Sequence, residues 1–234
     1  MKKLIIVCAK KTSSQFPNKN LKKINGVSLV AIAIKKALAI GKKNKVIVST
    51  DCKKIKKIAL SLGAEVPFIR PSKLSNKYSP EWKVWQHALN YCIKKQNYMP
   101  DIFISIPPTS PLGNLKDKKK CIKKYNASKV DGIVTTYKSK VNPYFNMVKF
   151  NRKSYLELAN KTKKKIFNRQ QSPDILSLTT VAYVMNPNFI LKKNSLFQGN
   201  IKSINIPYSR SIDIDSELDL FIAKKLINYG QKNI

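Results

Sequence analysis

Acidic residues are scarce in this sequence, which has 12 Asp and Glu against 46 Lys and Arg and a formal charge of +34 at neutral pH. A charge of this size is typical of proteins that bind nucleic acids or anionic membranes. Arginine is scarce too, because it occupies only four positions and lysine supplies the other basic residues. The lysines are spread over every amphipathic segment. This spread favours a solvated lysine coat, so we expect no specific nucleic-acid partner.

Cysteines and long apolar runs are also few. The four cysteines, at positions 8, 52, 92 and 121, form no CxxC pair and have no histidine beside them. We therefore expect reduced thiols and a cytoplasmic protein. No apolar run reaches the roughly 18–20 residues that span a bilayer, so no membrane insertion is expected. The run Leu4–Ala9 is too short for a signal peptide and is typical of a buried strand.

Strand patterns alternate with helix patterns through the first 137 residues. This alternation predicts an α/β fold with a doubly wound, mostly parallel sheet. The predicted strands are Leu4–Ala9, Lys45–Thr50, Glu65–Ile69, Asp101–Ile106 and Gly132–Tyr137. The predicted helices are Gly26–Gly41, one capped by Asp51, one that starts at Ser79-Pro80-Glu81, and Lys116–Tyr125.

The pattern changes after Lys138. Residues 140–170 show short, irregular strand patterns without a crossover helix, which predicts a small β excursion from the main sheet. The remaining predicted elements are a strand at Leu178–Val184, a short helix at Asn188–Lys192, a strand at Ile201–Ile206 and a final helix at Glu217–Tyr229. Because no linker or repeat interrupts the chain, residues 1–234 are expected to form one domain.

Ligands of doubly wound sheets bind beyond the carboxyl ends of the strands. The polar segments that follow four predicted strands therefore belong to one cleft. Its expected lining is Lys10, Ser13, Lys19, Asn20, Asp51, Arg70, Thr109 and Ser110. Where lysine is the default cation, an arginine points to a site that needs a planar, bidentate donor. Arg70, Arg169 and Arg210 are such candidates.

The acidic stretch Ser209–Asp219 stands out against this basic background. Asp213 and Asp215 alternate with isoleucines, so an extended backbone would place both carboxylates on one face. Paired carboxylates suit a hard cation such as Mg²⁺, and with the cations of the cleft they suit a phosphate-rich ligand. The alternative is that one of the two aspartates only caps the helix that starts near Ser216.

Seven short motifs, taken in their order, resemble one enzyme family over the whole chain. They are Phe16–Leu21, Val48–Asp51, Gly63–Pro71, Pro108–Leu112, Asn142-Pro143, Arg169-Gln170 and Ser211–Asp219. The chain resembles the acylneuraminate cytidylyltransferases (CMP-sialic acid synthetases) and the related CMP-Kdo synthetases. The resemblance implies a nucleotide-diphospho-sugar transferase-like fold and a reaction of CTP with a sugar acid that yields a CMP-sugar and pyrophosphate. It also implies Mg²⁺ as cofactor and a homodimer in which residues 140–170 form the dimerisation arm.

The resemblance and the predicted cleft together suggest roles for individual residues. Nucleotide binding falls to Lys10, Ser13, Lys19, Asn20, Arg70 and Ser79, and sugar binding to Thr109, Ser110, Arg169 and Tyr183. Catalysis falls to Lys19, Asp213 and Asp215, and the two aspartates are the expected metal ligands. Simpler roles stay open: Lys10 and Lys19 as solvated lysines, Arg70 as partner of Asp51 or Glu81, and Tyr183 as core packing.

The chain also departs from the family pattern. Lys11 and Thr12 replace two glycines of the nucleotide loop, and Ser14-Gln15 replaces a Lys-Arg pair. Pro107 stands where the family has glutamine, and Gly113 where it has arginine. A second hypothesis follows from these losses: a protein with the family fold that has lost catalysis and serves in binding or assembly.

Overall fold

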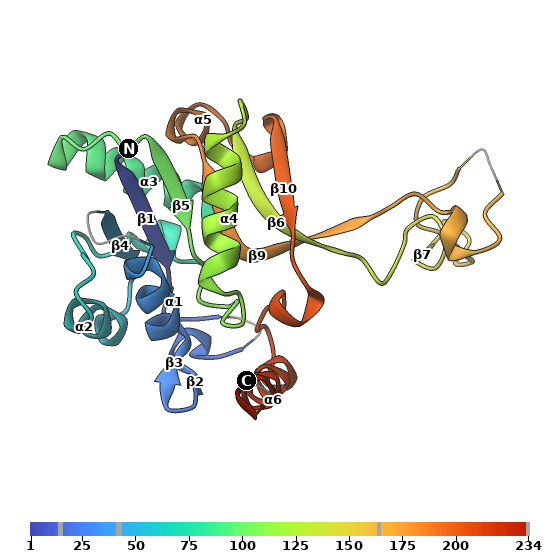
Figure 1. The fold of residues 1–234 in the computed structure, drawn as a ribbon, viewed down its shortest axis with the longest axis horizontal. Helices are drawn as coiled ribbons and strands as arrows, with labels where there is room; N and C mark the ends of the chain where they lie inside the picture. Colours follow the sequence, from blue (N-terminus) through green and yellow to red (C-terminus); the bar gives the residue numbers. More distant parts are fainter. Residues whose placement is uncertain (14–15, 41–43, 163–164, 233–234) are drawn as a thin grey trace.

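A six-stranded sheet forms the centre of the molecule (Figure 1). The computed structural model describes residues 1–13, 16–40, 44–162 and 165–232. From one edge to the other, the strands are β10 (Ile201–Asn205), β6 (Gly132–Lys138), β9 (Leu176–Met185), β5 (Ile102–Ser105), β1 (Lys3–Cys8) and β4 (Lys45–Ser49). Neighbouring strands are parallel except at β9, so the sheet is mixed and mostly parallel.

The sheet is mostly parallel, as the sequence predicted, and β9 is its antiparallel strand. β9 pairs antiparallel with both β5 and β6, in the middle of the sheet. The cause is the connection from β6 to β9, which leaves the sheet as an extended arm and returns without a crossover helix. Strands that are joined without a crossover run antiparallel.

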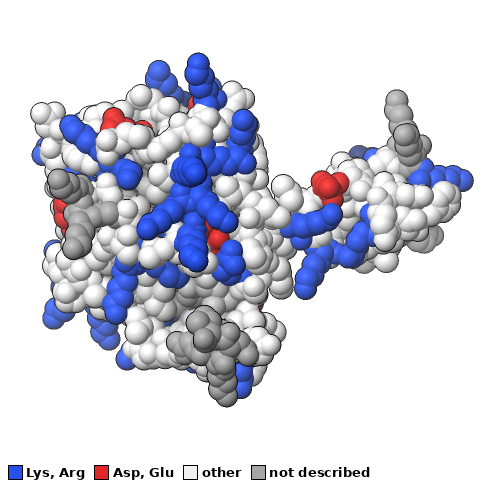
Figure 2. Space-filling view, in the orientation of Figure 1, with Lys and Arg blue, Asp and Glu red and all other residues white. Residues whose placement is uncertain are grey.

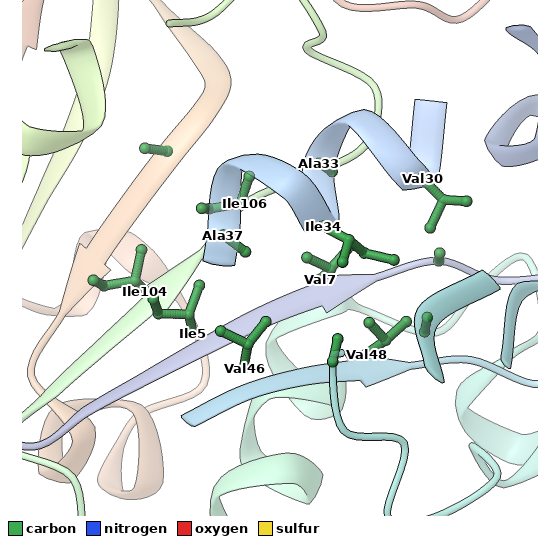
Figure 3. Packing of buried hydrophobic residues seen from close by; sticks show 14 of the residues in the cluster. Ile5, Val7, Val30, Ala33, Ile34, Ala37, Val46, Val48, Ile104 and Ile106 are labelled. Carbon is green, nitrogen blue, oxygen red and sulfur yellow. The ribbon is translucent and has the colours of Figure 1, made fainter. Parts of the chain in front are cut away.

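Helices cover both faces of the sheet. One face carries α1 (Leu29–Leu38), α2 (Lys53–Ser61) and α4 (Leu115–Asn126), and the other carries α3 (Glu81–Gln96) and α5 (Pro187–Lys192). Figure 3 shows Ile34 of α1 packed over Val7 of β1 on the first of these faces. Each strand has apolar residues on both faces, and this burial is the main favourable term for folding.

A third apolar cluster lies beyond the carboxyl ends of the strands. Here Leu220 and Ala223 of α6 (Glu217–Lys232) pack with Ile214, Phe16 and Leu29. The small hairpin of β2 (Lys23–Ile24) and β3 (Val27–Ser28) adjoins them. The short 3₁₀ turns are η1 (Lys19–Leu21), η2 (Ser72–Leu74), η3 (Arg169–Gln171), η4 (Leu196–Gln198) and η5 (Tyr208–Arg210).

Three local predictions were wrong. Residues 65–69 form a single bridge, Glu65 to Ile47, because Pro67 cannot donate to a ladder. The helix predicted from Gly26 starts at Leu29, after the β2–β3 hairpin, and Ser28 caps it. Asp51 does not cap α2; its carboxylate accepts a hydrogen bond from the backbone N–H of Lys11 at 2.6 Å.

The arm between β6 and β9 extends away from the body of the molecule (Figure 1). It carries the two-stranded sheet of β7 (Val148–Phe150) and β8 (Leu156–Leu158), and residues 163–164 within it lie outside the described residues. Its apolar side chains are exposed, for example Phe150 at 72% and Leu156 at 63%. Such exposure in a single copy is typical of a surface that a partner covers.

Basic side chains are spread over the surface. Figure 2 shows Lys and Arg distributed over the body and the arm, with a group over α4 and few acids between them. Among the helices that the structure describes, none is both long and apolar enough to cross a membrane.

A pair of leucines tests the assignment of the core. Leu89 of α3 is fully buried and Leu60 of α2 is 52% exposed. We expect Leu89→Ala to lower the free energy of unfolding by about 2–5 kcal/mol, since the substitution leaves a cavity. Leu60→Ala is expected to change it by less than about 0.5 kcal/mol. Urea denaturation of both variants measures the difference, and equal effects would contradict this packing.

Candidate active site

Seven of the predicted site residues line one cavity of about 210 Å³ at the carboxyl ends of β1 and β5. They are Lys10, Ser13, Lys19, Asn20, Arg70, Ser79 and Thr109. Sequence segments that lie up to a hundred residues apart therefore meet in one place. The remaining lining residues are Cys8, Leu74, Asn76, Glu81, Val84, Pro107 and Pro108.

The loop after β1 keeps a defined path without the family's glycines. Asn20 is buried and donates from Nδ2 to the carbonyl of Lys10 at 2.9 Å. Phe16 anchors the loop in the apolar cluster with Ile214, and Asn18 adopts a left-handed backbone with φ of 54°. Asparagine tolerates this conformation better than most residues. Ser14 and Gln15, which replace the family's Lys-Arg pair, lie outside the described residues.

Lys19 connects the loop to the acidic stretch. Its Nζ lies 2.7 Å from Oδ1 of Asp215, and the Lys19 side chain is only 13% exposed. The ammonium group therefore faces both the cavity and the late carboxylates. This position does not match that of a freely solvated lysine.

Asp213 lies beside this ion pair in a restricted environment. Burial raises the pKa of its carboxyl above the usual 3.8, and the negative charge of Asp215 adds to the shift. The hydroxyl groups of Thr109 and Thr180 and the charge of Lys19 oppose that increase. Among the described residues, the buried Oδ1 of Asp213 has no hydrogen-bond partner. A buried oxygen without a partner costs free energy, and a bound cation or donor would satisfy it.

Helix α6 is capped by residues other than Asp213 and Asp215. Ser216 Oγ accepts from the N–H of Asp219 at 3.2 Å, and Asp219 Oδ2 accepts from the N–H of Ser216 at 2.8 Å. This reciprocal arrangement is a capping box at the start of α6. Asp213 and Asp215 are therefore not needed to cap the helix.

The simpler alternative for Arg70 was an ion pair with Asp51 or Glu81, but its side chain bonds Ser49 instead. Its side chain is 5% exposed and donates from Nε to Ser49 Oγ at 3.0 Å and from a terminal nitrogen to the Ser49 carbonyl. The backbone N–H of Arg70 donates to Thr50 at 2.9 Å. These contacts fix the guanidinium at the cavity wall.

Glu81 and Cys8 are the site residues that sequence reasoning missed. Glu81 begins α3, and the sequence suggested for it only a helix start and an alternative contact with Arg70. Its carboxylate reaches the cavity, accepts from Trp85 Nε1 at 3.2 Å and lies beside the Cys8 thiol. The surrounding protein displaces water from the carboxyl group and raises its pKa above the usual 4.5, although the side chain is open to the cavity. The scarcity of acids was the signal that would have identified it.

Three predicted sugar-binding residues lie outside the cavity lining. Ser110 is buried and shares a hydrogen bond with Thr180 at 2.5 Å. Tyr183 on β9 packs against Trp85 with ring centroids 5.3 Å apart, and burial raises its pKa. Arg169 lies in η3 on the arm and donates to the Lys140 carbonyl at 2.7 Å.

Thr180 reaches this region because the pairing of β9 is irregular. The register of β6 and β9 shifts between Val134 and Thr135, where the partner changes from Tyr183 to Thr179. The intervening residues of β9 bulge out of the ladder, and bulges next to sites commonly redirect side chains. Thr180 thereby bonds Ser110 and lies near Asp213.

The fold resembles that of solved α/β proteins. The chain superposes on a solved structure of CMP:2-keto-3-deoxy-manno-octonic acid synthetase complexed with CTP with a TM-score of 0.71, at 15% sequence identity, over 98% of this chain and 100% of the other. At that identity the likeness concerns the fold alone.

Sequence comparison identifies the family. The model of the cytidylyltransferase family matches residues 4–198, and the chain belongs to this family. It is 29% identical to the post-translational flagellin modification protein B of Campylobacter coli, over 99% of this chain and 96% of that protein. It is 28% identical to the CMP-N,N'-diacetyllegionaminic acid synthase of Campylobacter jejuni, over 96% of this chain and 94% of that protein.

Glu81 gives a pH test of the site. A carboxyl whose pKa is raised in the folded state holds its proton more tightly there than in the unfolded chain, so its ionisation lowers stability as the pH rises above about 4.5. We expect Glu81→Gln to raise the melting temperature of the ligand-free protein at pH 7–8, and this gain should shrink toward pH 4.5. Calorimetry across this range measures it; a gain that does not depend on pH would contradict the raised pKa.

Proposed function

We propose that the protein transfers the cytidylyl group of CTP to a hydroxyl group of a sialic-acid-like or other ulosonic sugar acid and releases pyrophosphate. The observation that carries the proposal is the cavity lined by Lys10, Lys19, Asn20 and Arg70, where Lys19 also forms an ion pair with Asp215 of the acidic stretch. The family membership and the name of the similar synthase from Campylobacter jejuni support this class of reaction. The synthase named for N,N'-diacetyllegionaminic acid makes a nine-carbon sugar acid the leading candidate substrate.

Each polar residue of the cavity has a separate role in the proposed reaction. Lys10 and Lys19 neutralise the phosphates of CTP, and Asn20 and Arg70 hold the nucleotide in position. Displacement at the α-phosphorus depends mainly on alignment and on the neutralisation of charge, and these fixed cations supply both. Asp213 accepts the proton of the attacking hydroxyl, since its ionised form has a free, buried oxygen.

Asp213 and Asp215 also fit a magnesium ion. Mg²⁺ prefers oxygen ligands, and it is commonly held by one or two carboxylates together with substrate phosphates. The partnerless Oδ1 of Asp213 is the kind of oxygen that such an ion satisfies. When bound there, Mg²⁺ would stabilise negative charge on the phosphates as a Lewis acid.

The activity assay is pyrophosphate release from CTP and Mg²⁺ with a panel of sugar acids. The panel contains N,N'-diacetyllegionaminic acid, N-acetylneuraminic acid and 2-keto-3-deoxy-manno-octonic acid. We expect release with at least one of them and abolition of turnover in Asp213→Asn. The matched control is Asp101→Asn, because Asp101 lies at the amino end of β5 and bonds Lys2.

Two outcomes would decide against this reading. If Asp213→Asn turned over as fast as the unchanged protein, Asp213 would have no part in the reaction. If CTP bound without release of pyrophosphate with any sugar acid, the protein would be a binding or assembly member of the family. Pro107 in the cavity wall, where the family pattern has glutamine, is the observation that favours this second function.

The arm is proposed to join two copies of the chain, each lending residues such as Arg169 to the other's sugar site. The exposed apolar residues Phe150 and Leu156 support this role. We expect a dimer mass by light scattering, and a monomer for Leu156→Asp because the added charge opposes burial. Leu60→Asp, on an exposed face of α2, serves as control. A monomeric unchanged protein, or a Leu156→Asp dimer, would contradict the proposed arm contact.

A further inference from the structure

The acidic stretch is fastened on both sides of Asp213. Before it, Arg210 donates from Nε to Asp117 Oδ2 and from a terminal nitrogen to Asp117 Oδ1, both at 2.9 Å. After it, the N–H of Ile214 donates to the Thr109 carbonyl at 2.8 Å, and the Ile214 side chain is fully buried. Asp213 therefore lies between two fixed points that are four residues apart.

Asp117 is a rigid partner for Arg210. Its side chain is 2% exposed and belongs to the first turn of α4, where Asn114 and Asp117 form a capping box. Asp117 Oδ2 also accepts from the N–H of Asn114 at 3.2 Å. The carboxylate is thus oriented before the arginine binds, at the helix end that favours negative charge. A planar guanidinium that meets it in two bonds is fixed in direction as well as distance.

The same end of α4 holds the loop that carries Thr109. Lys118 Nζ, almost fully buried, donates to the Gly113 carbonyl at 3.1 Å, and Lys36 Nζ of α1 donates to the same carbonyl at 2.8 Å. A side chain at Gly113 would collide with Val181, so the loop packs closely there. The segment that carries Arg210 and the loop that carries Thr109 are therefore both attached to the amino end of α4.

We propose that Arg210 and Asp117 are a positioning pair, which holds the Asp213 carboxylate against Thr109, a residue of the cavity lining, and thereby sets the rate of the chemical step. The inference rests on the proposed cytidylyltransferase activity for its kinetic consequences, and on the geometry alone for its structural ones. Neither residue lines the cavity, so neither is expected to bind CTP directly.

Substitution of Arg210 separates positioning from binding. Arg210→Lys keeps the charge but loses the paired bonds. We expect kcat to fall about 10- to 100-fold, in keeping with the cost of a displacement of about 1 Å at a reacting group. The KM for CTP should stay within about twofold. Asp117→Asn, which retains an acceptor for the cap, should act similarly, and the double variant should lose little more than either single one because the two residues act as a unit.

Two further measurements exclude simple destabilisation. Guanidinium ion at a low, non-denaturing concentration should restore part of the kcat of Arg210→Ala and leave Arg210→Lys unchanged. Hydrogen exchange should quicken at the Ile214 amide in Arg210→Lys, while the amides of β1 keep their protection. Glu65→Gln, which breaks the partly exposed pair of Lys45 and Glu65 at the far end of β4, is the control and should change neither kcat nor this exchange.

Several outcomes would overturn the proposal. It fails if Arg210→Lys loses melting temperature but keeps its kcat, since the pair would then be structural only. It also fails if the KM for CTP rises while kcat holds. If the unchanged protein releases no pyrophosphate, the proposed function fails, and the exchange at Ile214 still decides whether Arg210 fixes the segment.

Discussion

The burial of Ile214 beside Phe16 is the interaction on which the site depends. Phe16 belongs to the loop after β1 and Ile214 to the acidic stretch, and both enter one apolar cluster with Leu29 of α1. The polar groups that flank them are thereby brought close together beside the cavity that Lys19 lines. Lys19 meets Asp215 across this junction at 2.7 Å. The hydrophobic effect supplies the driving force, and the charged groups follow because they are neighbours in sequence of the buried side chains.

The main architecture could be predicted because its signals are local. Apolar runs such as Leu4–Ala9 give strands, helix patterns between them give a layered α/β fold, and the strand ends give one cleft. The sequence pattern shows that no crossover helix precedes β9, but the antiparallel direction that follows from this was not predicted. The bulge that turns Thr180 toward Ser110 depends on three residues out of register, and no periodicity in the chain records such a shift.

Chain position at the strand ends predicted that Lys10, Asn20 and Arg70 would meet in one cavity, and they do; their roles in binding stay predictions. Glu81 was missed because a glutamate at a helix start has a sufficient local explanation. Ser110 was expected to meet a sugar, yet it bonds Thr180 inside the protein. Arg169 shows the remaining difficulty: it lies on the arm, and its proposed role in the sugar site of a partner requires a second copy of the chain. Ser14 and Gln15 lie outside the described residues, so the effect of their departure from the family pattern stays a prediction.

The lysine coat has a kinetic meaning for a protein whose proposed ligands are both anions. A charge of +34 produces a positive field that extends about one Debye length, or ~8–10 Å, into physiological solution. A negatively charged molecule that diffuses through this field meets the surface more often than a neutral one, and added salt removes the advantage. The acids near the site, such as Glu81, Asp213 and Asp215, are a local exception to this positive background. The whole positive surface thus raises the rate at which anionic ligands arrive, and the few carboxylates at the site affect which of them binds.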